Sequence, residues 1–241
     1  LVKDINPGTA SAFTVYDFKS TATNGKFYVV AEDEELDHQI RVIDTDSLQA
    51  STVFVDVSGG GTASLVHAMN GEIYAAVDGS SAGDGLWKLG EGKQHTGNLQ
   101  IGSVFPSSFV QLQDNLYFIG QDSEHGKELR RYDGTGVKLI SEIGPAEQGN
   151  NTGWMIAYQD KILLTASEST HSIELYVYHS AADSIQRFDL NPGSEASLPA
   201  FYTMHRDTVF FAANHPELGR ELWKYDGDVL ATIDVAVGAE S

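Results

Sequence analysis

One short apolar segment occurs five times along this chain of 241 residues. Its copies begin 46, 43, 46 and 47 residues apart, at Phe27, Ile73, Leu116, Ile162 and Val209. A second apolar position lies 13 residues after each copy and keeps the same spacing, at Ile40, Leu86, Leu129, Leu175 and Leu222. Two positions that advance in step define a unit of fixed length. The chain is therefore expected to consist of five diverged copies of one repeat of about 46 residues.

A third recurring feature is an acidic-apolar pair at the end of a strand. It occurs at Asp4-Ile5, Asp56-Val57, Glu142-Ile143, Asp189-Leu190 and Asp234-Val235, with Ser103-Val104 as a diverged copy. Its spacing varies more than that of the other two features, so insertions fall around it, as they do in loops. These features predict repeats at approximately 6–57, 58–104, 105–143, 144–190 and 191–235.

Each repeat is predicted to contain four short antiparallel strands. In the last copy these cover Pro199–Met204, Val209–Ala213, Glu221–Tyr225 and Leu230–Val235. His205–Asp207 forms a tight turn, Asn214–Arg220 is a longer polar loop, and Asp226-Gly227 is a hairpin signal. A four-strand period of 40 to 50 residues favours a β-propeller over a sandwich or barrel. The predicted fold is all-β, a five-bladed β-propeller forming a single domain over residues 1–241.

Six copies of the fourth strand accompany five copies of the others. Leu1–Ile5 is a fourth strand with no blade before it, and Ala231–Val235 is its counterpart at the other end of the chain. A terminal strand is therefore expected to complete the last blade and close the ring, because an open ring would leave an exposed strand edge.

The charge of the chain restricts its partners. It has 34 acidic and 15 basic residues, a net charge of −19, and no cysteine. Nucleic acid is excluded as a partner, since its binding depends on Lys and Arg contacts to phosphate. Disulfides and zinc-thiolate sites are impossible, and no apolar stretch is long enough to predict membrane insertion. A strongly acidic surface suits a soluble monomer.

The third-strand segments carry a recognisable motif. The best copies are Glu221-Leu222-Trp223-Lys224-Tyr225-Asp226-Gly227 and the segment Glu128–Thr135, in which Arg130 replaces the tryptophan. These segments, with the loops Asp4–Gly8 and Asp189–Gly193, resemble the ELWxxDGT repeat family along the whole chain. The resemblance implies a domain of large secreted or surface-attached bacterial proteins, and so an extracellular or cell-surface location. In architecture alone, the repeats are also similar to tachylectin-type sugar-binding propellers.

The binding face is predicted to carry the loops between second and third strands and those between blades, which emerge on the same side of a propeller. Polar residues recur just after the second strands: Asp33, Asp78, Asp122, Glu168 and Asn214. They are candidate ligand-binding residues, or alternatively anchors of solvated loops. Trp154 precedes a first strand, is expected to be exposed and is a further candidate ligand-binding residue. Trp87, Trp223 and Tyr176 are instead expected to pack between blades.

Two interpretations of the recurring acids remain open. Asp4, Asp56, Glu142, Asp189 and Asp234 could line a calcium site, or each could hydrogen-bond to backbone N–H groups of its own turn. The acidic run Glu32–Glu35 suits a solvated face, and the eight histidines show no metal-ligand spacing. Calcium is therefore a candidate cofactor without a motif of its own.

An enzyme is the least favoured function. A glycosidase needs two carboxylates across the scissile bond, on strands that line the central pocket. The predicted first strands contain no Asp or Glu: Phe13–Tyr16, Ser64–Met69, Ser107–Leu112, Met155–Tyr158 and Pro199–Met204. The sequence thus favours a non-catalytic extracellular module that binds carbohydrate or a surface glycan. A protein-interaction or spacer domain of a large bacterial surface protein is the alternative, and a glycoside hydrolase comes last.

Overall fold

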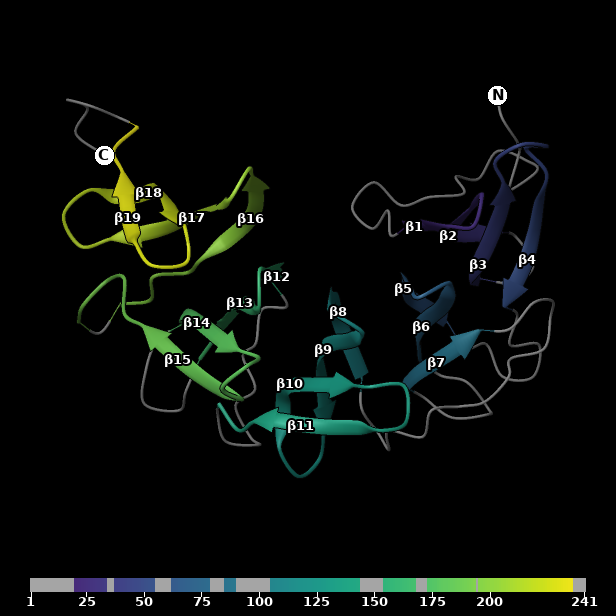
Figure 1. The fold of residues 1–241 in the computed structure, drawn as a ribbon, viewed down its shortest axis with the longest axis horizontal. Coiled ribbons are helices and arrows are strands. Elements are labelled where there is room, and N and C mark those ends of the chain that lie inside the picture. Colours follow the sequence, from purple (N-terminus) through teal and green to yellow (C-terminus); the bar gives the residue numbers. More distant parts are fainter. Residues whose placement is uncertain are drawn as a thin grey trace. The chain divides into compact units, whose positions relative to one another are not determined.

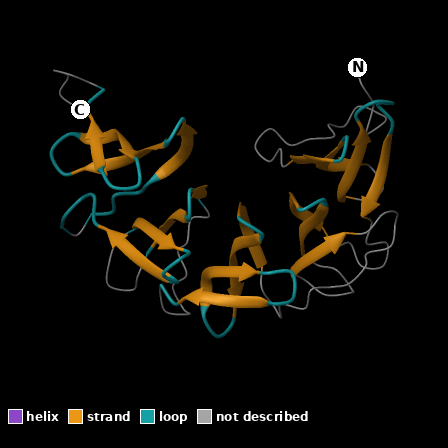
Figure 2. Ribbon diagram, in the orientation of Figure 1, coloured by secondary structure: helices purple, strands orange, loops and turns teal. Residues whose placement is uncertain are grey.

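A computed structural model describes residues 20–33, 37–54, 62–78, 85–89, 105–143, 154–167, 173–193 and 195–235. In this part of the chain all regular elements are β-strands, nineteen in number (Figures 1 and 2). No helix there is long and apolar enough to cross a membrane.

The strands form five antiparallel sheets, each made of strands that are consecutive in the chain. The first sheet contains β1 (Ser20–Thr23), β2 (Lys26–Asp33), β3 (Asp37–Asp44) and β4 (Ala50–Phe54). The second contains β5 (Thr62–Met69), β6 (Glu72–Asp78) and β7 (Gly85–Leu89). The third contains β8 (Phe105–Leu112), β9 (Asn115–Asp122), β10 (Gly126–Tyr132) and β11 (Val137–Ser141). The fourth contains β12 (Met155–Tyr158), β13 (Lys161–Ala166), β14 (Glu174–His179) and β15 (Ser184–Phe188). The fifth contains β16 (Ala200–His205), β17 (Thr208–His215), β18 (Gly219–Tyr225) and β19 (Leu230–Ile233).

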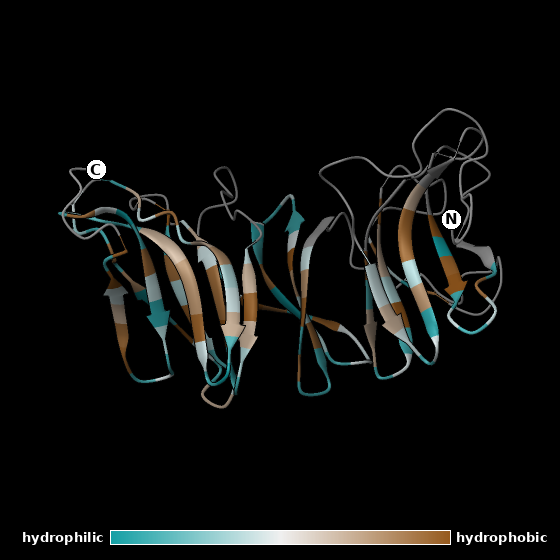
Figure 3. Cartoon of the chain, turned by 90° about the horizontal axis from the view of Figure 1, so that it is seen from above, coloured by the Kyte–Doolittle hydropathy of each residue, from teal (hydrophilic) through white to brown (hydrophobic). Residues whose placement is uncertain are grey.

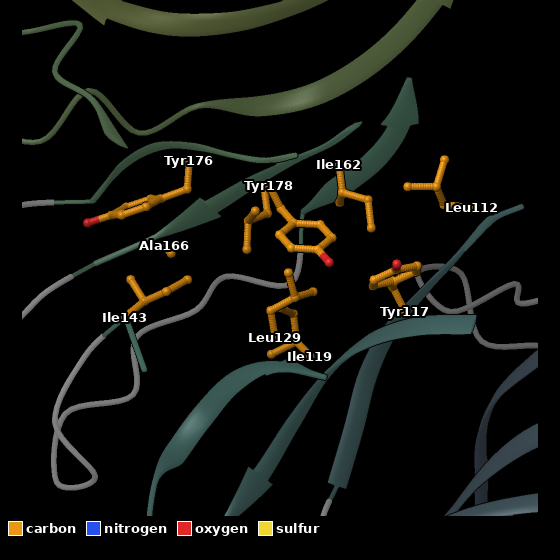
Figure 4. Close-up of a cluster of buried hydrophobic side chains, with 10 residues drawn as sticks. Leu112, Tyr117, Ile119, Leu129, Ile143, Ile162, Ala166, Tyr176 and Tyr178 are labelled. Carbon is orange, nitrogen blue, oxygen red and sulfur yellow. The ribbon is translucent and has the colours of Figure 1, made fainter. Parts of the chain in front are cut away.

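The chain divides into two compact units, Leu1–Ser107 and Ser108–Ser241. In the first unit, Val30 and Ile40 of the first sheet share an apolar core with Trp87 and other residues of the second sheet. In the second unit, one core lies between the third and fourth sheets and another between the fourth and fifth. Figure 4 shows Tyr117 and Leu129 of the third sheet facing Ile162 and Tyr178 of the fourth. Within each unit, successive sheets therefore pack face to face.

The central strands show why this packing follows from the sequence. Leu163, Val177 and Leu175 of the fourth sheet face the fifth, whereas Ile162, Leu164 and their neighbours face the third. A strand covered on both faces reads as a continuous apolar run, as in Ile162–Ala166, every residue of which is buried. Outer strands such as β15 and β19 alternate or are half-buried, and Figure 3 shows polar and apolar stretches alternating along the strands.

The turns between first and second strands repeat with the sequence. One residue with a positive φ, between 50° and 56°, occurs at the same place in all five, at Asn24, Asn70, Gln113, Gln159 and Arg206. These positions are again 46, 43, 46 and 47 residues apart. The predicted tight turns are confirmed, and so is the fixed length of the unit.

The third-strand motif has a structural role in the described repeats. Glu128 is buried and accepts a hydrogen bond from the backbone N–H of Ile143 (2.8 Å), and Glu221 accepts one from Val235 (3.2 Å). The Asp of the motif closes the next turn, since Asp133 accepts N–H bonds from Thr135 and Gly136. The Asp carboxylate thus fixes the turn between the third and fourth strands, and the Glu carboxylate fixes the chain just after the fourth strand.

Two predictions about local structure are wrong. The strand that pairs with β2 is Ser20–Thr23, later in the chain than the predicted Phe13–Tyr16, which lies outside the described residues. The predicted loop Asn214–Arg220 and the equivalent segment Asp122–Lys127 are strand at both ends, with three-residue turns at 216–218 and 123–125. Their polar side chains are typical of loops, yet the backbone there continues the ladder. The expected strands at Leu1–Ile5 and around Ser103-Val104 lie outside the described residues.

Candidate ligand-binding site

The polar residues predicted to recur as one set occupy two different positions of the second strand. Asp33 and Asp122 end their strands opposite the first residues of β3 and β10. Asn214 lies one residue earlier, opposite Arg220, and His215 takes the place of Asp122. Asp78 also lies at the earlier position, one residue after the Val77–Gly85 pair, and Glu168 is outside the described residues. Adjacent strand residues face opposite sides, so Asp122 and Asn214 do not occupy equivalent positions.

Asp122 is the centre of a charged network in the third sheet. Arg130, which is almost fully buried, forms a salt bridge with the Asp122 carboxylate. The backbone N–H groups of Glu124 and His125 donate to Asp122 Oδ1 at 2.9 and 2.6 Å. His125 Nδ1 lies 3.2 Å from Asp122 Oδ2, and Nε2 lies 3.6 Å from Glu142 Oε1.

The ionisation of Asp122 follows from these contacts. Burial alone would raise the pKa of this carboxyl group. The hydrogen bonds from His125 and the positive charge of Arg130 outweigh that effect and lower the pKa of Asp122 to about 2. With its acceptor atoms already occupied by the turn and by Arg130, Asp122 is a structural residue of the third sheet. Its contacts are those of the loop-anchor alternative for this position.

Asn214 belongs to a different arrangement, at the start of the fifth sheet. Its Nδ2 donates to Ala196 O at 2.9 Å, and Arg220 Nη1 lies 3.4 Å from Asn214 Oδ1. The same Arg220 nitrogen donates to Leu198 O at 3.2 Å. Arg220 is exposed, and Leu198 is an exposed large hydrophobic residue. Asn214 and Arg220 thereby hold the segment that leads into β16.

An exposed aromatic pair stands next to this segment. Trp154 is 42% exposed and Phe201 is 65% exposed, and their ring centroids are 5.0 Å apart with the planes inclined at 60°. Trp154 directly precedes β12 in the fourth sheet, and Phe201 lies in β16 of the fifth. Two large aromatic side chains from neighbouring sheets are therefore presented together to solvent.

Thr165 positions both sides of the pair. Its backbone N–H donates to Trp154 O at 3.0 Å. Its hydroxyl donates to Pro199 O at 2.7 Å, so the contact of 2.8 Å with Tyr202 must use the tyrosine as donor. Thr165 is buried, which makes this link between the fourth and fifth sheets a dry one. The aromatic pair thus rests on a buried hydrogen-bonded support.

The backbone at Phe201 is strained. Phe201 has a φ of 61° and Leu198 a φ of 47°. The pairing of β16 with β17 shifts register between Ala200 and Thr203, so Phe201 lies in a bulge. A bulky residue with positive φ is a genuine outlier that costs on the order of 1–3 kcal/mol, and such residues cluster at ligand-binding sites. The bulge turns an aromatic ring outward that a regular strand would have placed differently.

The remaining predicted residues have other surroundings. Trp87, Trp223 and Tyr176 are buried, which confirms packing between sheets rather than a ligand-facing role. Of the recurring acids, Glu142 lies near His125, and Asp189 lies 4.0 Å from Arg187, while Asp4 and Asp56 are outside the described residues. In the described residues no three His, Asp or Glu side chains gather in a way that suits a metal ion. Calcium stays a hypothesis for the chain as a whole.

The sequence patterns do not predict Phe201 or Arg220 as ligand-binding residues. Phe201 lies within a segment that reads as an ordinary first strand, and only the register shift against β17 brings it outward. Arg220 is the polar residue before the Glu of the motif, and its bonds reach carbonyl groups of other segments. The one signal was Phe201-Tyr202, two adjacent large aromatics in a strand where one face is expected to be polar.

The sequence matches no protein family and no curated protein. Solved structures with a similar fold include a puromycin hydrolase, with 9% identity and a TM-score of 0.57 over 81% of this chain. Another is a puromycin-hydrolysing peptidase from Mycobacterium tuberculosis, with 13% identity and a TM-score of 0.63 over 93% of this chain. This chain spans 32% and 39% of the length of those two structures. At such low identity the likeness concerns the fold alone.

Proposed function

We propose that the five sheets are the blades of one five-bladed β-propeller, closed by a terminal strand. Three observations support this arrangement: each sheet is a meander of consecutive strands, successive sheets in each unit pack face to face, and the tight turns repeat in register with the sequence. The proposed closure satisfies the last free sheet edge.

We further propose that the chain is a non-catalytic, extracellular or cell-surface module that binds carbohydrate at the Trp154–Phe201 pair. The observation that carries this proposal is the exposed pair itself, held by a buried support and by a strained backbone. Large aromatic rings give an apolar platform for one face of a sugar ring, and polar groups beside it give direction. Asn214 and Arg220 are polar groups bonded to the segment that leads into Phe201.

Catalysis by the chain itself has less support. The first strands of the sheets contain no Asp or Glu, and this is true of β1 (Ser20–Thr23) as well as of β5, β8, β12 and β16. A glycosidase would require such carboxylates near the centre of the ring. The names of the similar structures refer to puromycin hydrolysis by proteins about three times longer than the part that resembles this chain.

A protein-interaction role is the second candidate, because an exposed apolar pair also suits a protein partner. A glycan array with the purified chain distinguishes the two. We expect clear binding to at least one glycan, a loss of about tenfold or more for Trp154→Ala and for Phe201→Ala, and no loss for Val229→Ala. Val229 is a similarly exposed apolar residue on a different turn, which makes it a matched control. Silence across the array from a folded sample would reject the carbohydrate proposal in favour of a protein partner.

A further inference from the structure

Arg220 carries a positive charge that no described carboxylate balances. Other basic side chains of the same unit form ion pairs, as Arg130 does with Asp122, Lys138 with Asp183 and Lys161 with Asp160. The described contacts of the Arg220 guanidinium are to Leu198 O, Ala212 O and Asn214 Oδ1, all of them neutral groups. In a chain with 34 acidic and 15 basic residues, carboxylates are the commoner partner for an arginine. The exposed charge of Arg220 is therefore available to an anion.

The three neutral contacts also orient the guanidinium group. Nη1 is held by Leu198 O at 3.2 Å and Asn214 Oδ1 at 3.4 Å, and Nη2 by Ala212 O at 3.5 Å. A guanidinium group has five N–H donors, so these bonds leave others free. A fixed planar fork with free donors is the geometry that binds a carboxylate or sulfate through two parallel hydrogen bonds.

The position of Arg220 connects this charge to the aromatic pair. The Leu198 carbonyl that it holds lies three residues before Phe201, at the entrance to the bulge. Leu198 is itself exposed, and the short segment from Leu198 to Phe201 has a positive φ at both ends. Arg220 is thus a described cation that is bonded to the segment leading into Phe201, one ring of the exposed pair.

We propose that this site selects acidic sugars, with Arg220 as the specificity-determining residue for a carboxylate or sulfate group. This inference rests on the proposed carbohydrate-binding function. The net charge of −19 repels anionic ligands from the rest of the surface, so an anionic sugar is held only where a cation faces it. The selectivity thus depends on one side chain.

The test is an array of matched glycan pairs that differ in one anionic group. One pair is an oligogalacturonate and its methyl ester, and another is a sulfated galactan oligosaccharide and its desulfated form. We expect the acidic member to bind about tenfold or more tightly, with the two pairs showing whether carboxylate or sulfate is preferred. Arg220→Gln should remove the preference, so that the acidic and neutral members of each pair bind with equal affinity. Arg220→Lys should retain part of it, because the charge remains but the fork is lost.

Arg206→Gln is the matched control, since Arg206 is an exposed arginine in a turn between first and second strands. It should leave the preference intact, and thermal melts establish that each variant is folded. If the wild type binds neutral and acidic members equally, or if Arg220→Gln keeps the preference, the inference about acidic sugars is wrong while carbohydrate binding stands. If no glycan binds, the proposed function itself fails. Two results together support both carbohydrate binding and the selection of acidic sugars. Trp154→Ala should lose binding to both members of a pair, and Arg220→Gln should lose the preference, which Arg206→Gln keeps.

Discussion

Arg130 in the third sheet and Trp223 in the fifth donate to the same backbone position of their neighbouring strand. Arg130 Nε donates to Gly120 O at 3.4 Å, and Trp223 Nε1 donates to Ala213 O at 3.1 Å. Gly120 and Ala213 are equivalent, since each pairs with the Glu of its own motif. The side chain at the end of the second strand differs in step with this donor. Arg130 pairs with Asp122, whereas the ring of Trp223 lies 5.8 Å from the ring of His215, which occupies the place of Asp122. An ion pair in one repeat thus replaces an aromatic pair in another.

This exchange predicts that the two positions are coupled. Asp122→His alone leaves a buried guanidinium without its carboxylate, and we expect a loss of about 3 kcal/mol in the free energy of unfolding. Adding Arg130→Trp recreates the pair of the fifth sheet, with Phe118 at the place that Phe211 occupies beside Trp223. The double variant should recover more than half of that loss, measured by urea unfolding in a double-mutant cycle. Additive losses would mean that the two positions are independent.

The pH dependence of stability tests the Asp122 network separately. The pKa of Asp122 is about 2 in the folded chain and about 3.9 in an unfolded one. A lowered folded pKa contributes stability that is present above pH 4 and is lost as the pH falls towards 2. Asp122→Asn should therefore reduce the loss of stability between pH 5 and pH 2.5 that urea unfolding measures in the wild type.

Asp133 provides the comparison for that experiment. Hydrogen bonds from the Thr135 hydroxyl and from the Thr135 and Gly136 backbone lower its pKa to about 2 as well, at an exposed turn. Asp133→Asn should reduce the same slope, while leaving the contribution of Asp122 in place. The variant with both substitutions should then show the shallowest slope of the four. Identical slopes for Asp122→Asn and the wild type would show that the ion pair does not form in solution.

The repeating part of the fold was predictable because its signals are local. The spacing from Leu116 to Leu129 reflects a strand, a turn and a strand of constant length, which insertions elsewhere do not disturb. The polar strand ends were misread because Asn214 and His215 look like loop residues, although they continue the ladder opposite Gly219 and Arg220. The site depends on the bulge at Phe201, which is a property of two strands together. In a single segment its one signal is the pair of adjacent aromatics Phe201-Tyr202, which does not reveal the bulge.

The buried glutamates of the motif should contribute stability rather than binding. Glu128→Ala and Glu221→Ala each remove the acceptor of a backbone N–H, at Ile143 and Val235, and we expect losses of about 1–3 kcal/mol. Gln at either position keeps a side-chain oxygen and should lose less. Thermal melts measure the stability, and the glycan array should show unchanged binding by every variant that remains folded. A selective loss of glycan binding would instead give these residues a place in the site.

The variant Phe201→Gly separates the backbone strain at the bulge from the contribution of the Phe201 ring to glycan binding. Glycine adopts a φ of 61° without strain, whereas phenylalanine does so at a cost of on the order of 1–3 kcal/mol. Because the Phe201 ring is 65% exposed, its removal forfeits little burial. We therefore expect the free energy of unfolding to stay constant or rise by up to about 1 kcal/mol, while glycan binding falls.

Phe201→Ala removes the same ring but retains the Cβ atom that makes the positive φ unfavourable, so it should bind as weakly and be less stable than the glycine variant. Lower stability of Phe201→Gly than of Phe201→Ala would show that the positive φ is not kept in solution, and the argument from strain to binding would fail with it.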